Sequence, residues 1–162
     1  MLIIDTYIAA GGVAGIGTFA GEFIPKGTVM WVYHPKFDQA YTREELDRLP
    51  LASRKHIEVY KFLSDASGKY IVCLDGARHF NHSWEPNTYC PCTIGELTPA
   101  QRAQLTEDQW SDVDPHEKVT IALKDIQKGE EITCDYEQVS LPSSFPPSRP
   151  PPIFSRLPAR PN

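Results

Sequence analysis

RHFNHSWEPN, residues 78–87, is a run of hydrogen-bonding side chains with one proline that sets a turn. An apolar, strand-like segment, residues 70–74, lies immediately before it. Buried Asn, His and Ser groups need hydrogen-bond partners, so such a dense polar loop has few purely structural uses. We therefore expect this loop to fold inward and to form the wall of a ligand site.

Three simple chemistries could use this loop, and each lacks a necessary part. His79 and His82 could bind a metal with Asp75, but the helical spacing of a zinc protease motif is missing. His82 and Ser83 could belong to a hydrolase, but no nucleophile elbow surrounds the serine. The Asn81 sequon for glycosylation is meaningful only in a secreted protein.

Composition narrows the class of protein. A chain of 162 residues with 41% hydrophobic content predicts one domain with a real core. The N-terminus carries no export pattern, and no apolar run is long enough to span a bilayer. The four cysteines form neither a disulfide framework nor a zinc pattern, so we expect no metal and a cytoplasmic, reducing location.

Charge separates the body of the chain from its tail. Residues 141–162 hold three arginines and no acid, so this tail is +3; because the whole chain is −5, residues 1–140 are −8. An acidic body argues against direct nucleic-acid binding, and it suits either a lysine-bearing peptide or simple solubility. The tail also holds eight of the fifteen prolines, which predicts a partly disordered or polyproline-like segment.

Two segments of the chain echo each other. Residues 20–27 read AGEFIPKG and residues 122–129 read ALKDIQKG, with alanine, isoleucine, lysine and glycine at matching positions. The shared Ile-x-Lys-Gly pattern predicts a tight turn in which glycine takes the unusual backbone angle. We expect two strand-turn-strand units, which suggests small sheets packed together.

Other local patterns predict short elements along the chain. Alternating β-branched and aromatic residues favour strands at 2–8 and 119–122. Capping boxes predict helix starts at Thr42, Thr98 and Thr106, the last two within a short helical insertion over 98–111. Helical spacing of Ile57, Tyr60 and Leu63 predicts a helix over 51–63, with this stripe in the core.

The order of three motifs identifies a family. GIGTFA at residues 15–20, RHFNHSWEPN at 78–87 and GEEITCDY at 129–136 together resemble the SET-domain family of lysine methyltransferases. The resemblance covers about residues 2–137, leaves an insertion at 93–116 unmatched, and looks most like the short stand-alone SET proteins of bacteria or viruses.

The resemblance implies a fold and a domain division. The fold would be mainly β with short helices (α+β), a β-clip of several small sheets with a knot-like C-terminal threading. Residues 1–140 would form the SET domain and residues 141–162 the tail.

The resemblance also implies an activity: methyl transfer from S-adenosylmethionine (SAM) to a lysine side chain of a histone-like or other basic protein. The family's cofactor contacts fall on Gly15, Ile16, Gly17, Arg78, Phe80, Asn81, His82 and Tyr136. Tyr136 would also be the catalytic tyrosine, and the substrate channel would involve Cys134, Tyr89 and Phe145.

The sequence departs from the family pattern at the loop. Trp84 stands where the family often has a zinc-binding cysteine, and the tail lacks the matching cysteine cluster. We therefore expect no zinc module, and Phe145 or Phe154 could close the lysine channel as a lid. His79 stands where phenylalanine is usual, and the small Cys134 could leave room for a multiply methylated lysine.

Two readings of function stay open at this point. One is an active enzyme, located in the cytoplasm or in a host nucleus if the protein is viral or a secreted effector. The other is a weakly active or inactive SET-fold module that binds SAM or a peptide.

Overall fold

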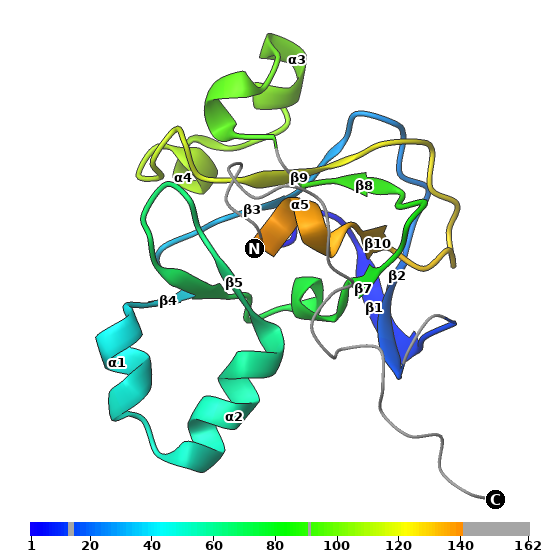
Figure 1. The fold of residues 1–162 in the computed structure, drawn as a ribbon. Helices are drawn as coiled ribbons and strands as arrows, with labels where there is room; N and C mark the ends of the chain where they lie inside the picture. The colour runs from blue at the N-terminus through cyan, green and yellow to red at the C-terminus, as the bar shows by residue number, and fades with distance from the viewer. Residues whose placement is uncertain (13–14, 91, 141–162) are drawn as a thin grey trace, which may run out of the picture.

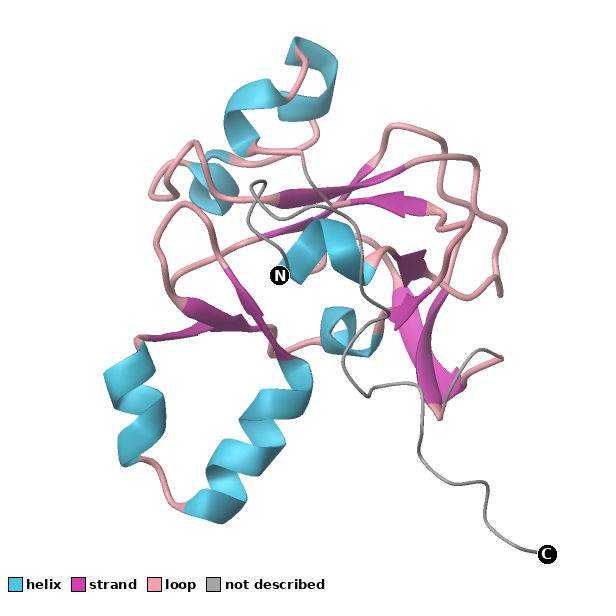
Figure 2. Ribbon diagram, in the orientation of Figure 1, coloured by secondary structure: helices cyan, strands magenta, loops and turns pink. Residues whose placement is uncertain are grey.

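The structure is a computed structural model that describes residues 1–12, 15–90 and 92–140. Within them, four small sheets are joined by short helices, as expected for the predicted α+β class (Figures 1 and 2). The strands are β1 (Thr6–Ala10), β2 (Ile16–Ala20), β3 (Val29–Val32), β4 (Gln39–Tyr41), β5 (Lys61–Leu63), β6 (Tyr70–Val72), β7 (Asn81–His82), β8 (Thr88–Tyr89), β9 (Val119–Ala122) and β10 (Thr133–Cys134).

The sheets differ in size and direction. Strands β1 and β2 form an antiparallel hairpin, β3-β9-β8 and β4-β6-β5 form antiparallel three-stranded sheets, and β7 pairs with β10 in parallel. The helices are α1 (Arg43–Arg48), α2 (Leu51–Tyr60), α3 (Pro99–Arg102), α4 (Glu107–Trp110) and α5 (Tyr136–Ser140), with 3₁₀ turns η1 (Gly76–His79) and η2 (Ile94–Glu96). No helix in the described part of the chain is long and apolar enough to cross a membrane.

The two echoing turns face each other. The backbone N–H groups of Ile24 and Ile126 each donate to the other's carbonyl at 2.9 Å, and both side chains are buried. Gly27 and Gly129 take φ angles of 83° and 84°, as the turn pattern predicts. Each glycine also donates, at 2.8 Å, to the alanine that opens the opposite unit. The sequence echo therefore has a direct structural counterpart.

The apolar interior consists of two clusters. The first surrounds the facing turns and contains Met30, Phe80, Ile132 and the two turn isoleucines. The second joins β3 and β9 to the predicted insertion, whose apolar side chains are buried against those strands: Ile94, Leu97, Leu105 and Val113. Each fully buried aliphatic side chain contributes about 1.5–3 kcal/mol, so the insertion is held by burial as well as by its caps.

The predicted helix starts are confirmed. The Thr42 hydroxyl accepts from Glu45 N at 3.2 Å, and the Glu45 carboxylate accepts from Thr42 N at 2.7 Å. Thr98 and Gln101 make the same reciprocal pair, and α4 starts after Thr106 with a capping box of its own. These caps satisfy backbone N–H groups that a helix start leaves unpaired.

Two element predictions need correction. The helix expected over 51–63 ends at Tyr60, because residues 61–63 pair with β6 instead. No residue of α2 is buried, so its apolar stripe is not core; Tyr60 lies at a cavity described below. The first strand runs from Thr6 to Ala10 rather than over 2–8, since Ile3 N bonds to Met30 O at 3.0 Å away from the hairpin.

Asn87 connects the polar loop to the C-terminal motif. Its amide nitrogen donates to the Glu131 carbonyl at 2.8 Å and to Glu130 Oε1 at 3.1 Å. Its amide oxygen accepts from Thr133 N at 2.8 Å, and the residue is only 3% exposed. All three bonds bridge segments more than forty residues apart in sequence, so Asn87 is a clamp between them.

Replacing Asn87 by alanine should destabilise the fold strongly. The change leaves the buried N–H of Thr133 and the carbonyl of Glu131 without their partners, and each such group costs about 1–3 kcal/mol. We expect urea denaturation to show the free energy of unfolding reduced by about 3 kcal/mol. The control is Gln39→Ala, which removes an exposed amide; equal effects in both variants would contradict the clamp.

Candidate active site

The parallel pairing of β7 with β10 brings two of the sequence motifs side by side. Asn81 lies opposite Thr133 and His82 opposite Cys134, and Ser83 N donates to the Cys134 carbonyl at 3.0 Å. Only part of the polar loop folds inward: Phe80 and Asn87 are buried, whereas Trp84 is 68% exposed. Asn81 and His82 therefore lie next to the segment that carries Tyr136.

Glu131 connects the glycine segment to the polar loop. Its carboxylate accepts from Gly12 N at 2.7 Å and from Asn81 Nδ2 at 2.7 Å. Asn81 Nδ2 also donates to the Ile16 carbonyl at 3.2 Å. Sequence reasoning did not single out Glu131, although it stands in the quoted GEE motif; its partners lie far from it in the chain.

The same carboxylate lies where a side chain at Gly17 would be, so a larger residue there would have to displace it. A Cβ at this position would lie 2.3 Å from Glu131 Oε1 and 3.2 Å from Asn81 Nδ2. Gly15 takes a φ of 48°, a backbone angle that side chains disfavour. The Gly-x-Gly pattern therefore reflects one close approach and one left-handed residue.

His82 has one satisfied and one unsatisfied ring nitrogen. Tyr136 N donates to His82 Nδ1 at 3.2 Å, which places the proton of a neutral ring on Nε2. That Nε2 is buried and has no hydrogen-bond partner among the described residues. The ring lies edge-on to Trp84, with centroids 4.4 Å apart, and Trp84 is 68% exposed. A buried donor without an acceptor is costly, which fits a place that a ligand completes.

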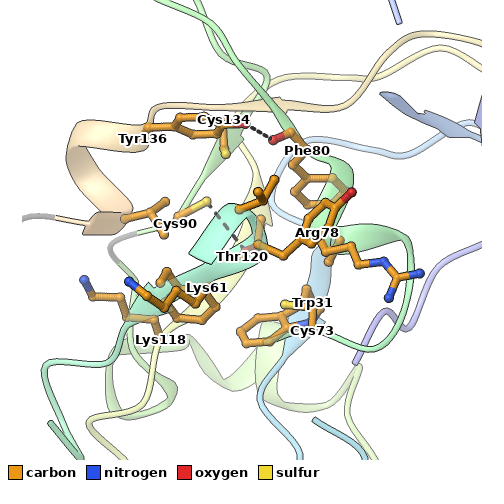
Figure 3. Close-up of a pocket in the computed structure, with 15 residues that line it drawn as sticks. Trp31, Lys61, Cys73, Arg78, Phe80, Cys90, Lys118, Thr120, Cys134 and Tyr136 are labelled. Carbon is orange, nitrogen blue, oxygen red and sulfur yellow. Dashed lines mark hydrogen bonds between the residues drawn. The ribbon is translucent and has the colours of Figure 1, made fainter. Parts of the chain in front are cut away.

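Tyr136 is held as a neutral phenol. Its hydroxyl donates to the Phe80 carbonyl at 2.8 Å (Figure 3). Burial, and secondarily the neighbouring Cys134, raise the pKa of Tyr136 to about 12. At neutral pH the Tyr136 hydroxyl therefore stays protonated, and its hydrogen points at the Phe80 carbonyl. The oxygen lone pairs remain available to accept another hydrogen bond. A phenol in this state cannot serve as a phenolate base.

A cavity of about 140 Å³ lies against Tyr136 (Figure 3). Its walls are mostly aromatic and apolar, with three cysteines and three cationic side chains: Trp31, Val59, Tyr60, Lys61, Phe62, Cys73, Ala77, Arg78, Phe80, Cys90, Lys118, Thr120, Cys134, Tyr136 and Val139. Lys61 pairs with Glu58 at 3.0 Å and Lys118 with Asp65 at 2.9 Å.

The predicted site residues lie in two places, one around Glu131 and the segment of Tyr136 and the other at the cavity wall. Gly17, Asn81 and His82 lie around the Glu131 and Tyr136 segment, as the preceding contacts show. Arg78, Phe80, Cys134 and Tyr136 line the cavity.

Arg78, predicted as a cofactor contact, lines the cavity and contacts His79 and Tyr60. Its Nε donates to His79 Nε2 at 3.2 Å, and its guanidinium lies 5.8 Å from the centre of the Tyr60 ring. Tyr89, predicted for the substrate channel, is 39% exposed and is not among the described residues that line the cavity. Phe145 and Phe154 lie outside the described residues.

The comparison with protein families decides the classification. The family model of the SET domain matches residues 15–137. The chain belongs to the SET-domain family. No curated protein sequence matches this SET chain.

Solved structures with the same fold are distant in sequence. A candidate histone methyltransferase of Plasmodium falciparum is 21% identical, with a TM-score of 0.53 over 82% of this chain and 93% of that one. A Polycomb repressive complex 2 of Chaetomium thermophilum, a humanized mutant bound to an inhibitor, is 19% identical, with a TM-score of 0.54. The match covers 84% of this SET chain but 15% of that chain, and at such identities it shows the fold alone.

The protonation of Tyr136 should be measurable. Its folded-state pKa lies above the ordinary value of 10.0, so the stability that it contributes is present below pH 10.0 and is lost as pH rises toward about 12. We expect the tyrosinate absorbance difference between wild type and Tyr136→Phe to have its midpoint near 12, with folding checked by circular dichroism. The control is Tyr7→Phe on an exposed strand; a Tyr136 midpoint at 10.0 would contradict the buried phenol.

Gly17 and Glu131 should be energetically coupled. In wild type, Gly17→Ala forces the Glu131 carboxylate from its two donors and should cost about 1–3 kcal/mol of stability. In a Glu131→Ala background the same change should cost less than about 1 kcal/mol, because the obstructing carboxylate is gone. Urea denaturation of the four proteins measures the coupling, and purely additive effects would show that the close contact has no energetic weight.

Proposed function

We propose that this chain is a SAM-dependent protein-lysine N-methyltransferase. The observation that carries the proposal is the neutral Tyr136 phenol, which donates to the Phe80 carbonyl at the wall of an aromatic cavity. Asn81 and His82 lie on β7, paired with the β10 strand that leads to Tyr136. Membership of the SET family supports this assignment of roles.

The residues present fit SAM as the cofactor. We assign its binding to the backbone of residues 15–17 together with Asn81 and His82. The unpartnered His82 Nε2–H offers a buried donor. The Glu131 carboxylate beside them adds negative charge, which favours a cationic ligand. When bound, SAM supplies an electrophilic methyl group on a sulfonium ion.

The cavity walls suit a lysine that must lose its proton. An ordinary lysine is neutral only about once in 10³ to 10⁴ at pH 7, equivalent to roughly 4.6 kcal/mol. Burial among Trp31, Phe62 and Tyr136 disfavours the ammonium form.

Tyr136 would position the amine rather than remove its proton. With its own hydrogen donated to Phe80, the phenol oxygen is left as an acceptor for an amine N–H. Holding the nucleophile in one orientation lowers the entropic part of the activation barrier, because the entropy is lost on binding rather than in the chemical step. The Phe80 carbonyl and the Tyr136 oxygen then form a fixed pair of dipoles at the cavity wall.

We further propose that the substrate is a basic segment of a protein and that the enzyme works in the cytoplasm. The −8 charge of residues 1–140 attracts cationic partners, while it disfavours a nucleic-acid partner. Histone-like proteins are one class with the required charge.

Incubation with labelled SAM and a panel of basic proteins tests the proposal. We expect SAM to raise the melting temperature and wild type to label at least one protein on lysine. Tyr136→Phe should retain SAM stabilisation but transfer methyl about 10²–10³-fold more slowly, since one positioned hydrogen-bonding group is lost. The matched control is Tyr7→Phe, which removes an exposed hydroxyl and should transfer at the wild-type rate.

Two results would change the assignment. SAM stabilisation without label on any protein would favour a SET-fold binding module over an enzyme. A chain that SAM does not stabilise would contradict the proposed cofactor site itself.

A further inference from the structure

Three of the four cysteines converge on the cavity beside Tyr136. Cys73, Cys90 and Cys134 all line its wall, and all are buried free thiols. Cys92 belongs to the other apolar cluster, where its thiol donates to the Thr93 carbonyl. Methyl transfer as proposed above uses none of these sulfur atoms as a nucleophile.

The Cys90 sulfur lies among hydrogen-bond donors. Thr120 Oγ1 donates to it at 3.6 Å (Figure 3), and Cys134 lies on the same cavity wall. Thr88 Oγ1 is 3.8 Å away but gives its only proton to the Thr133 carbonyl at 2.8 Å, so toward Cys90 it can only accept. The hydrogen bond that the Thr120 hydroxyl donates to this sulfur favours the thiolate form of Cys90.

The two thiols are polarised in opposite directions. The hydrogen bond from Cys134, then that from Thr120, lowers the pKa of Cys90 against the opposing effect of burial; the Lys118 cation helps. The same bond, together with burial, raises the pKa of Cys134 well above its ordinary value. A thiolate is the reactive form of cysteine, and Cys90 is the sulfur to which the Thr120 hydroxyl donates, so we take Cys90 as the nucleophile of the pair.

The backbone holds the pair in place. Cys90 directly follows β8 and Cys134 ends β10. The Thr88–Thr133 bond and the Asn87 clamp join these two segments next to the sulfurs. Val59, at 53% exposed, lies on the cavity wall, so the cavity borders the surface there.

We propose that Cys90 and Cys134 form a hydroperoxide-sensitive thiol pair in which Cys90 is attacked first and Cys134 resolves it to a disulfide. The geometry that supports this is the place of both sulfurs on one cavity wall, the Thr120 hydroxyl that donates to Cys90, and the Thr88–Thr133 bond that joins the two segments. The oxidant in this proposal is a small hydroperoxide.

The chemistry balances in two steps. The Cys90 thiolate attacks the terminal oxygen of the hydroperoxide; an S–O bond forms, the O–O bond breaks, and the leaving alkoxide or hydroxide takes a proton. Cys134 then attacks the Cys90 sulfenic acid; an S–S bond forms, the S–O bond breaks, and the departing hydroxide takes the Cys134 proton to give water. Two thiols are oxidised and one hydroperoxide is reduced, after the sulfurs close to about 2.05 Å.

The disulfide would act on the proposed active site, and this consequence rests on the proposed function. Cys134 is paired with His82 and stands two residues before Tyr136. Drawing its sulfur toward β8 moves the cavity wall next to the phenol. Oxidation should therefore abolish methyl transfer, and reduction should restore it.

Peroxide titration of the full chain tests the pair directly. Before alkylation, we expect the treated chain to be lighter by about 2 Da, the two thiol hydrogens. After alkylation of the remaining free thiols, we expect a tryptic cross-link between the peptides that carry Cys90 and Cys134. Cys92 shares the Cys90 peptide, so Cys92→Ser is the matched control and should keep the cross-link. Cys134→Ser should lose it and leave a sulfenic acid on Cys90 that dimedone captures.

The outcomes separate the two proposals. A cross-link through Cys92 or Cys73, or four thiols that stay alkylatable at peroxide levels that fully oxidise free cysteine, would overturn the thiol pair. Mapping of the wild-type chain alone decides this if Cys134→Ser does not fold. A chain that forms the disulfide but transfers no methyl when reduced would contradict the proposed function and leave the thiol pair standing.

Discussion

The parallel pairing of β7 with β10 is the contact on which the rest of the site depends. Each strand has only two residues, far too few to be stable alone, so the pairing relies on groups outside it. Asn87 supplies three hydrogen bonds across the same junction, and Ile132, Phe80 and Cys134 bury apolar surface beneath it. Because of this pairing, His82 and Tyr136 lie within reach of each other across fifty-four residues.

The two mirrored turns form the frame that carries this junction. Ile24 and Ile126 exchange backbone hydrogen bonds, so the segments that follow them start from fixed relative positions. One unit leads into β3, and the other leads into Glu131 and β10. Glu131 then reaches back to Gly12 and Asn81, so that the frame, the glycine segment and the polar loop are connected by one carboxylate.

The chemistry of the site follows from burial more than from charge. Burial keeps Tyr136 neutral, and its hydrogen bond to Phe80 fixes which side of the oxygen is free. The same desolvated wall contains Cys90, whose hydrogen-bond donors oppose the effect of burial on its sulfur. One cavity thus combines a positioned phenol with a polarised thiol pair, and the segments that place the first also place the second.

The sequence alone determined the features that depend on neighbours within a few residues. These are the capping boxes at Thr42 and Thr98, the glycine turns at Gly27 and Gly129, and the order of three motifs that indicated the SET family. Local periodicity failed at residues 61–63, where pairing with β6 replaced the expected helix. Only the tertiary structure revealed Glu131 as the link between motifs, the cavity wall and the contact of Cys90 with Cys134. These features are contacts between residues some forty to one hundred and twenty positions apart, and a local pattern does not specify which distant group becomes the partner.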